Sequence, residues 1–216
     1  MTVLSWSSGK DSAWALHVLR SQGVEVEALL TTVNTTHDRV AMHAVRRELL
    51  EAQAAAAGVP LRIIDLPWPC PNEMYEARMS VAVRRLIADG FEQIAFGDLF
   101  LRDIREYREK KMEGLQIKPI FPLWDIPTSQ LASEMIAGGL KSRITCVDPR
   151  KLDAAFAGRV WERSLLDEFP PEVDPCGENG EFHTFAFAGP MFSRPINIHL
   201  GEIVKRDGFV FADMTL

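Results

Sequence analysis

The sequence predicts an α/β protein, with a doubly wound, five-stranded parallel sheet over residues 1–125 and a smaller α+β domain over residues 126–216. In the first part, short apolar runs alternate with longer amphipathic segments, as in strands joined by helical crossovers. In the last part, Arg206-Asp207-Gly208 separates two segments of alternating apolar and polar residues. This is a strong β-hairpin signal, so we expect antiparallel structure there.

The first part divides into alternating strands and helices. We expect strands at residues 3–6, 26–33, 61–66, 93–96 and 119–124, and helices at 13–20, 40–57, 73–88 and 104–115. Gly58 and Gly90 follow two of these helices as stop signals. Right-handed crossovers of this length place the strands parallel, with helices on both faces and the ligand site at the carboxyl ends of the strands.

The second part is mixed. We expect a helix at 130–137 capped by Thr128, strands at 140–147 and 182–187, a helix at 160–168, and hairpin strands at 196–205 and 209–215. This smaller domain should pack against the strand ends of the parallel sheet.

Composition narrows the functional classes. The chain has 216 residues, 47% of them hydrophobic, and a net charge of -6. No basic region stands out, so nucleic-acid binding is not expected. No run approaches the roughly 18 apolar residues of a membrane span, and the chain opens directly on a strand without a signal peptide. Cys70, Cys146 and Cys176 form no C-x-x-C pair, which favours a reducing cytoplasm and gives no support to a zinc site.

Ser7-Ser8-Gly9-Lys10-Asp11-Ser12 lies between the first strand and the first helix. A strand that turns into a helix start presents free backbone N–H groups and the positive end of the helix dipole, which suit phosphate groups. The spacing fits neither the Walker loop nor the Rossmann fingerprint. The alternative is that Ser8 or Ser12 only caps the helix.

Gly97-Asp98 follows the fourth expected strand. The topology places Asp98 opposite Asp11 at the same edge of the sheet, an arrangement suited to Mg²⁺ and its phosphates.

A second polar cluster spans residues 174–184. Glycines there alternate with polar side chains, namely Glu178, Asn179, Glu181, His183 and Thr184. This density suggests a binding loop, while an Asx-type surface turn is the alternative.

The first loop resembles the pyrophosphate loop of the ATP pyrophosphatase superfamily, with Ser8 in place of the first glycine of the motif. Where that glycine has a positive φ, Ser8 would be strained. Five segments together resemble the diphthine–ammonia ligase family: this loop, Gly97-Asp98, Arg105-Glu106, F-P-L-W at 121–124 and G-E-N-G-E-F-H-T-F at 177–185. The last segment has the form that also occurs in bacterial members of the family.

The resemblance implies a Rossmann-like (HUP-type) fold and a two-step amide synthesis. ATP adenylylates the carboxylate of diphthine on elongation factor 2 and releases pyrophosphate, and ammonium then displaces AMP. Bacteria lack the diphthamide pathway, so the acceptor is either diphthine or an unknown substitute. The length leaves no room for a glutaminase domain, so ammonia is expected from solution.

The resemblance and the charge demands of this reaction assign roles to particular residues. The phosphates of ATP would be held by Ser7, Ser8, Gly9, Lys10, Asp11, Ser12 and Gly97, adenine by the backbone of Thr31, Thr32 and Val33, and Mg²⁺ by Asp11 and Asp98. The catalytic residues would be Asp11, Asp98, Arg105, Glu106 and His183, and the acceptor would contact Glu178, Asn179, Glu181, His183 and Thr184. Arg105 would meet the anionic substrate, and His183 or a carboxylate would accept the proton of ammonium.

Several further interpretations remain open. His43, expected on the helix at 40–57, would face the ribose or serve only packing, and Arg102, Arg108 and Lys110 are expected on a solvated face. A tRNA sulfur transferase is one competing function, which would need a working cysteine pair and a basic surface. A non-catalytic ATP sensor is the other. Edge strands of the C-terminal hairpin could also pair two subunits into a homodimer.

Overall fold

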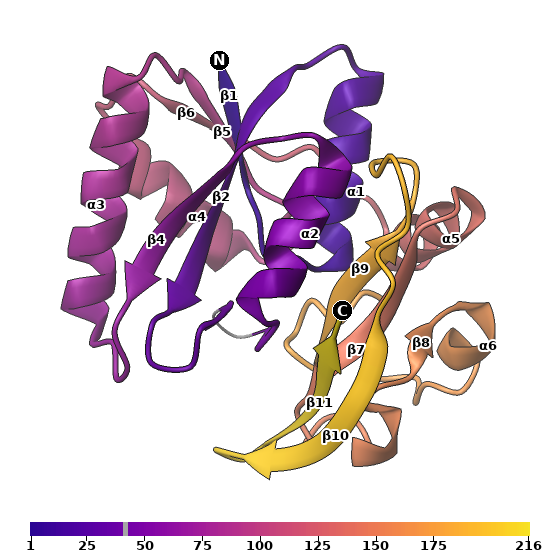
Figure 1. Cartoon of the computed structure of the whole chain (residues 1–216). Coiled ribbons are helices and arrows are strands. Elements are labelled where there is room, and N and C mark those ends of the chain that lie inside the picture. The colour runs from indigo at the N-terminus through magenta and orange to yellow at the C-terminus, as the bar shows by residue number, and fades with distance from the viewer. Residues whose placement is uncertain (41–42) are drawn as a thin grey trace.

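The computed structural model describes residues 1–40 and 43–216, and it contains two β-sheets (Figure 1). In the first sheet, five parallel strands follow the spatial order β4-β2-β1-β5-β6. They are β1 (Thr2–Ser5), β2 (Val26–Asn34), β4 (Leu61–Leu66), β5 (Gln93–Ala95) and β6 (Lys118–Ile120). The predicted doubly wound parallel sheet is therefore confirmed. A sixth strand, β3 (Arg39–Val40), pairs antiparallel with the end of β2 and was not predicted.

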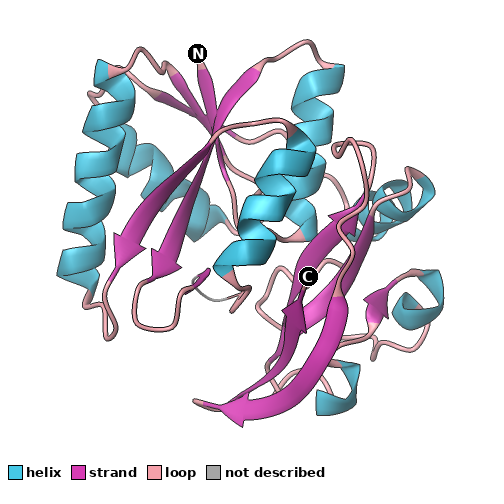
Figure 2. Cartoon of the chain, viewed as in Figure 1, coloured by secondary structure: helices cyan, strands magenta, loops and turns pink. Residues whose placement is uncertain are grey.

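Four helices cover the two faces of this sheet (Figure 2). They are α1 (Lys10–Ser21), α2 (Arg47–Ala57), α3 (Asn72–Ala88) and α4 (Arg102–Met112). Leu16 of α1 and Leu49 of α2 belong to one apolar cluster, whereas Leu86 of α3 and Met112 of α4 belong to another. The parallel strands lie between these clusters, which is why their sequences are almost continuously apolar.

The second sheet is antiparallel and has five strands. They are β7 (Lys141–Val147), β8 (Val160–Trp161), β9 (Phe182–Ala188), β10 (His199–Arg206) and β11 (Phe209–Thr215), accompanied by α5 (Thr128–Ala137) and α6 (Arg163–Leu166). A turn at Asp207-Gly208 joins β10 to β11, as the hairpin signal predicted. Phe185 of β9 and Leu16 of α1 lie in the same core cluster, so the second sheet packs on the α1–α2 side of the first.

The structure corrects three predicted elements. The helix expected at 40–57 begins only at Arg47. Val40 lies in β3, where it pairs with Val33 of β2, and Ala44 turns the chain with a φ of 54°. The helix expected at 160–168 is instead the strand β8 followed by the short α6.

The third correction concerns the strand expected at 119–124, which ends at Ile120. The following F-P-L-W segment forms a turn. Thr128 is the first residue of α5 and makes no side-chain cap, since Pro127 occupies the N-cap position.

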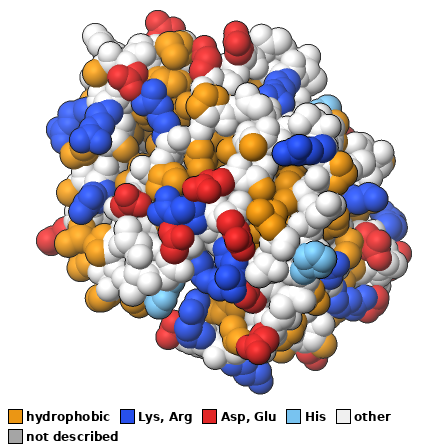
Figure 3. All heavy atoms as spheres, viewed as in Figure 1, with side chains coloured by type: hydrophobic (Ala, Val, Ile, Leu, Met, Phe, Trp, Pro, Cys, Tyr) orange, Lys and Arg blue, Asp and Glu red, His pale blue; other side chains and the backbone are white. Residues whose placement is uncertain are grey.

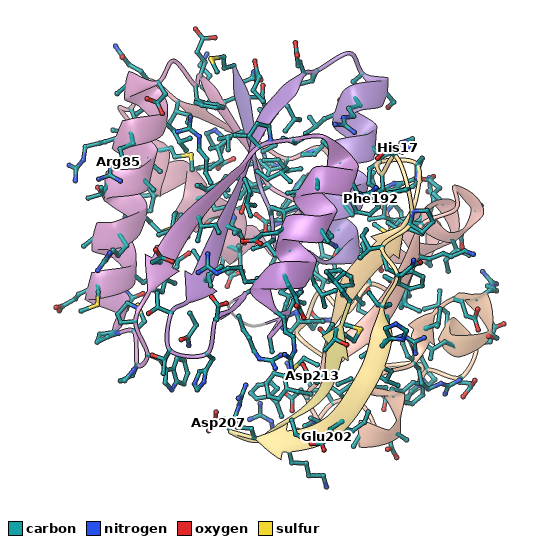
Figure 4. The ribbon with its side chains drawn as sticks, in the orientation of Figure 1. His17, Arg85, Phe192, Glu202, Asp207 and Asp213 are labelled. Atoms are coloured by element: carbon teal, nitrogen blue, oxygen red, sulfur yellow. The ribbon has the colours of Figure 1, made fainter. Side chains whose placement is uncertain are left out.

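An ion-pair cluster joins the two sheets at the surface. Asp213 of β11 accepts hydrogen bonds from Arg39 Nη1 at 2.8 Å and Arg46 Nη2 at 2.5 Å. These contacts lower the pKa of Asp213 to about 2. Figure 4 labels Asp213 beside β10, and Figure 3 shows charged side chains of both signs interspersed on the same face.

None of the helices at residues 1–40 or 43–216 combines the length and the apolar character that a bilayer crossing requires.

Candidate active site

The loop between β1 and α1 lies at the carboxyl end of β1, where the sequence predicted a phosphate site. Gly9 is the extended N-cap residue of α1, and no side chain caps this helix end. The Ser12 hydroxyl bonds instead to the Gly9 carbonyl oxygen at 3.0 Å and lies 3.2 Å from the Ser7 hydroxyl. The alternative of a simple serine cap is therefore wrong. At this helix start the Gly9 N–H bonds to the Ser7 hydroxyl at 3.3 Å and the Lys10 N–H to the Thr184 hydroxyl at 3.0 Å, so an anion would meet the N–H groups of the next residues, Asp11 and Ser12.

Ser8 has the left-handed conformation that the motif glycine would adopt easily, with a φ of 70°. Its side chain is fully buried, and its hydroxyl finds no partner among the described residues. The Ser8 carbonyl oxygen accepts hydrogen bonds from Gln53 Nε2 at 2.9 Å and from the Ala186 N–H at 3.0 Å. The surrounding contacts therefore hold a strained residue in place.

Lys10 is buried, with only 2% of its side chain exposed. Its ammonium group contacts both carboxylate oxygens of Asp11, at 2.8 and 3.0 Å, and donates to the Cys176 carbonyl oxygen. Burial opposes the charge of Lys10 most strongly, but the Asp11 carboxylate, together with smaller effects of Cys176 and Glu178, raises the pKa of the amine overall. Lys10 is therefore a buried ion-pair partner, unlike the solvated lysines common at helix starts.

Asp98 lies across from Asp11 at the end of β5. Gly97 brings the two segments together, since a Cβ atom there would lie 3.1 Å from the Asp11 carbonyl carbon and from the Ser12 nitrogen. Both oxygens of Asp98 are held by Arg108, through Nε at 2.5 Å and Nη2 at 3.0 Å. Arg108 was expected on a solvated face. Its guanidinium is instead a partner of the site and stacks over Phe96.

The polar loop at 174–184 folds over the start of α1. Its Thr184 hydroxyl accepts a hydrogen bond from the Lys10 N–H at 3.0 Å. Asp174 organises the loop as an Asx turn, accepting from the Cys176 N–H at 3.2 Å and the Glu178 N–H at 2.9 Å. The Asx turn is therefore confirmed, and the loop that it builds lies on the candidate site, while its role in binding stays a prediction.

Two of the predicted acceptor-binding residues serve the loop itself. Glu181 is buried, and its Oε1 accepts from the Asp174 N–H at 3.0 Å and from Asn179 Nδ2 at 3.2 Å. Lys151 donates to the Asn179 carbonyl oxygen at 2.6 Å. These contacts position the loop.

Glu178 is the member of the loop that enters the acidic end of the site. Its carboxylate accepts a hydrogen bond from the Leu99 N–H at 2.8 Å. Burial, together with the charge of Asp11 and a smaller effect of Asp98, raises the pKa of Glu178 to about 7. A carboxyl group with this pKa can bind and release a proton near neutral pH.

His43 and His183 stack on each other, with ring centroids 4.6 Å apart. His43 lies in the turn before α2, and its Nδ1 lies 3.0 Å from the Thr184 carbonyl oxygen, to which it therefore donates. Burial lowers the pKa of His43 to about 4 and that of His183 to about 3. A histidine with a pKa this low is a poor acceptor for a proton from ammonium, which disfavours the base role expected of His183.

Arg105 and Glu106 point in different directions from α4. The Arg105 guanidinium stacks over Phe121 and Trp124, at 4.7 Å from each ring centroid, and bonds to Glu109 at 2.8 Å. Glu106 is exposed and lines a shallow groove near the start of β6, apart from Asp11 and Asp98. The structure thus places Arg105 near the F-P-L-W turn and leaves Glu106 outside the cluster.

A cavity of about 250 Å³ opens beside the carboxyl ends of β2 and β4. Thr31, Thr32 and Val33 lie on β2, and the next residue, Asn34, lines the cavity. Its other walls are mostly aromatic or apolar, with arginines at the edge: Leu66, Trp68, His183, Phe209, Phe211, Arg39 and Arg206. Both parts of the chain therefore contribute to one partly open cavity.

Three residues of this region escaped the sequence analysis. Gln53 gives no signal within an Ala-rich helix, and Arg108 looks like any exposed helical arginine. Trp68 carries a sequence signal, because a tryptophan between Pro67 and Pro69 is expected in a loop. The structure shows this side chain to be 57% exposed, which is unusual for a tryptophan. Among the described residues, no group of three or more His, Cys, Asp or Glu side chains is arranged to hold a metal ion.

Comparisons with known proteins place this geometry in a family context. The chain matches the models for the N-terminal domain of diphthamide synthase over residues 1–119 and the C-terminal domain over residues 127–213. Diphthine–ammonia ligase of Danio rerio is 31% identical over 118 residues, which are 50% of this chain and 46% of that protein. The Homo sapiens protein of the same name is 29% identical over 127 residues, 56% of this chain and 47% of that one. The chain spans about half the length of these curated relatives.

A solved structure described as a predicted subunit of tRNA methyltransferase from Methanocaldococcus jannaschii DSM is 18% identical. The match covers 90% of this chain and 98% of that chain, with a TM-score of 0.41.

Replacement of Ser8 tests whether the loop is strained. Ser8→Gly should raise the free energy of unfolding by about 1 kcal/mol, because glycine adopts a positive φ without a steric penalty and removes an unpaired buried hydroxyl. Ser8→Ala is the matched control, since it removes the hydroxyl and keeps Cβ. Urea unfolding of the three proteins gives the comparison. A glycine variant no more stable than the alanine variant would show that the backbone conformation costs nothing.

Proposed function

The chain belongs to the diphthamide synthase family, and from this premise we propose that it is an ATP-dependent carbon–nitrogen ligase that forms AMP and pyrophosphate. One observation supports this most strongly. The loop at 174–184 closes on residues 7–12, the proposed phosphate loop, through the Thr184–Lys10 and Cys176–Lys10 contacts. It also brings Glu178 close enough to feel the charges of Asp11 and Asp98. A site built this way can hold ATP and a second substrate together.

The phosphate chain of ATP would lie over the start of α1. Backbone N–H groups and the Ser7 and Ser12 hydroxyls would bind its β and γ phosphates. Asp11 fits the role of a Mg²⁺ ligand, because this ion is commonly held by one or two carboxylates together with substrate phosphates. Asp98 fits that role less well, since Arg108 already holds both of its oxygens. A bound Mg²⁺ would neutralise charge on the phosphates.

The aromatic cavity beside β2 would take the adenosine of ATP. It begins at Asn34, directly after the Thr32–Val33 segment assigned to adenine by the resemblance. His183 lines this cavity and stacks on His43, whose Cε1 lies against Gly9 of the phosphate loop. The cavity and the phosphate loop are thus connected through two neutral rings, which suits a nucleoside bound between them.

The acceptor would approach from the side of Asp98 and Arg105. Attack of its carboxylate on the α-phosphate brings two anions together, and the Arg105 guanidinium is the cation available to stabilise them. In the second step, ammonia attacks the acyl-adenylate carbonyl, the bond to AMP breaks, and a proton must leave the nitrogen. Glu178 is the carboxylate suited to accept it. Thr184 and Asn179 position the loop that carries Glu178. The acceptor would be diphthine or another carboxylate.

A sulfur transferase fits the structure less well. Burial raises the pKa of Cys146 to about 12 and that of Cys176 higher still, so neither thiol ionises readily. All three cysteines are free, in keeping with a reducing cytoplasm. A non-catalytic ATP sensor would leave bound ATP intact, whereas the ligase would convert it to AMP and pyrophosphate.

Product analysis tests the proposed function. With Mg-ATP, ammonium and a pool of carboxylate acceptors that includes diphthine-modified elongation factor, we expect acceptor-dependent AMP and pyrophosphate. Asp11→Asn should lower this rate by about 100-fold or more, because it removes charge at the phosphates. Asp167→Asn, a surface change directly after α6, is the control. Formation of ADP and phosphate would reject the proposal. Intact bound ATP with every acceptor would favour the sensor.

The role of Glu178 predicts a pH dependence. At constant free ammonia, the amide-forming rate should rise with pH up to about 7 and then level off, because only the ionised carboxylate accepts a proton. Glu178→Gln should remove this inflection and slow the reaction by about 100-fold. Glu172→Gln, exposed in the same segment, should behave like the wild type. A Gln variant that keeps the inflection would assign the base elsewhere.

The adenosine cavity predicts a binding defect. Trp68→Ala should weaken ATP binding about tenfold, in line with the 1–3 kcal/mol typical of a base stacked on an aromatic ring, while Trp68→Phe should retain most of the affinity. Met74→Ala, another exposed apolar residue, serves as the control. Calorimetric titration with a non-hydrolysable ATP analogue gives the dissociation constants. Equal affinities for the wild type and Trp68→Ala would place adenosine outside this cavity.

A further inference from the structure

The outer strand of the second sheet, β10, is exposed along its whole length. It pairs with β11 on one side, and its other edge pairs with no strand in residues 1–40 or 43–216. All eight of its residues are exposed. Figure 1 shows it as the long curved arrow at the outside of the sheet. A strand edge of this length carries a row of free N–H and C=O groups, which can pair with another strand.

This strand also exposes apolar side chains. Leu200, Ile203 and Val204 are 47%, 49% and 39% exposed. Protective features on edge strands include proline, charged side chains, β-bulges and a short length. β10 contains no proline, but its pairing with β11 is irregular between Leu200 and Ile203, which bends the first half of the strand. The regular stretch from Ile203 to Arg206 is therefore the part of this edge that is open to pairing.

The pattern of its side chains shows which partner fits. Val204 lies opposite Phe211 and Arg206 opposite Phe209, so these two residues share one face of the sheet. The pairing is irregular between Leu200 and Ile203, so that Gly201 and Glu202 together lie opposite Asp213. Asp213 shares a face with Phe211 by alternation along β11, which places Glu202 on the face of Val204. Figure 4 labels Glu202 on β10, with Asp207 at the tip of the hairpin. One face of β10 therefore carries an acidic, an apolar and a basic side chain in succession: Glu202, Val204 and Arg206.

Two identical antiparallel strands in one sheet are related by a twofold axis perpendicular to the sheet, which keeps equivalent faces together. With the axis at Val204, Glu202 lies opposite the partner's Arg206, and the same pair occurs again on the other side. An axis at Glu202, Lys205 or Arg206 would place identical charges opposite each other. An axis at Ile203 would form no ion pair. Only the Val204 register makes this edge complementary to itself.

We propose that two copies of this chain pair β10 with β10, antiparallel about an axis at Val204, and so join their second sheets into one continuous sheet. The Val204 side chains meet at the axis, and reciprocal Glu202–Arg206 pairs flank them. The ion pair of Arg206 with Asp207 is long, at 3.8 Å, and exposed, and its guanidinium lies over Phe211 at 5.1 Å from the ring centroid. Ile203 packs along the aliphatic stem of Lys205 from the partner. Arg206 also lines the cavity proposed for adenosine, whereas Glu202 and Val204 do not.

Charge reversal tests the register. In sedimentation velocity over a range of concentrations, the wild type should be a dimer. Glu202→Arg and Arg206→Glu should each raise the dimer dissociation constant about tenfold or more, because each places like charges opposite each other twice. The double variant Glu202→Arg/Arg206→Glu should restore the dimer. Glu51→Arg, an exposed position on α2, makes the same charge change away from β10 and should leave the dimer intact.

A cross-link gives an independent test. Val204→Cys should form a disulfide-linked dimer under mild oxidation, since directly opposite residues in an antiparallel pair have Cβ atoms about 4.5–5.5 Å apart. Val81→Cys, similarly exposed on α3, should stay monomeric on a denaturing gel. Far-ultraviolet circular dichroism verifies that each variant folds. A wild type that is monomeric at every concentration, a dimer unaffected by either single reversal, or a double variant that fails to recover would overturn the proposal.

Discussion

The carboxamide of Gln53 is the contact on which the candidate site depends. It lies fully buried on α2, donates to the carbonyl oxygens of Ser8 at 2.9 Å and Ala186 at 2.6 Å, and accepts from Trp6 Nε1 at 3.0 Å. One side chain thus ties the phosphate loop, the second sheet and the first strand together. Without it, two carbonyl groups and an indole N–H would lose a buried partner, which costs far more than an exposed hydrogen bond gains.

Gln53 and Lys10 together explain why the site belongs to both parts of the chain. Gln53 holds the backbone of Ser8 from one side, and Lys10 extends from the next turn to the Cys176 carbonyl oxygen of the polar loop. The aromatic rings of Trp161 and Phe182 lie 5.5 Å from the Lys10 ammonium and exclude water from it. The positive φ of Ser8 persists because these contacts fix the residues around it.

The sequence predicts local structure well where periodicity and loop chemistry agree. The parallel strands, the phosphate loop, Gly97-Asp98 and the polar loop all carry local signals. Prediction fails where contacts between distant segments determine the secondary structure. Val40 was predicted to begin a helix but pairs with Val33 in a strand, and Trp161 was predicted to be helical but lies in β8 opposite Ser142. Gln53, the burial of Lys10 and the Arg108–Asp98 pair depend on segments that meet only in the folded chain, so no spacing rule could have found them.

The charge arrangement constrains how ATP, the proposed substrate, could enter. Three acidic side chains, Asp11, Asp98 and Glu178, face two buried or half-buried cations, and both cations are already paired. A polyphosphate cannot take Lys10 or Arg108 without leaving a carboxylate unpaired, which is costly in an enclosed site. Its charge must therefore be met by the N–H groups of α1, by whatever cation arrives with it, and by Arg105, whose partner Glu109 is 44% exposed and can be solvated by water when the pair opens. An accompanying divalent cation would compete with Lys10 for the Asp11 carboxylate. Since Lys10 also donates to the Cys176 carbonyl oxygen, nucleotide binding and the contact between Lys10 and the polar loop are expected to be energetically coupled.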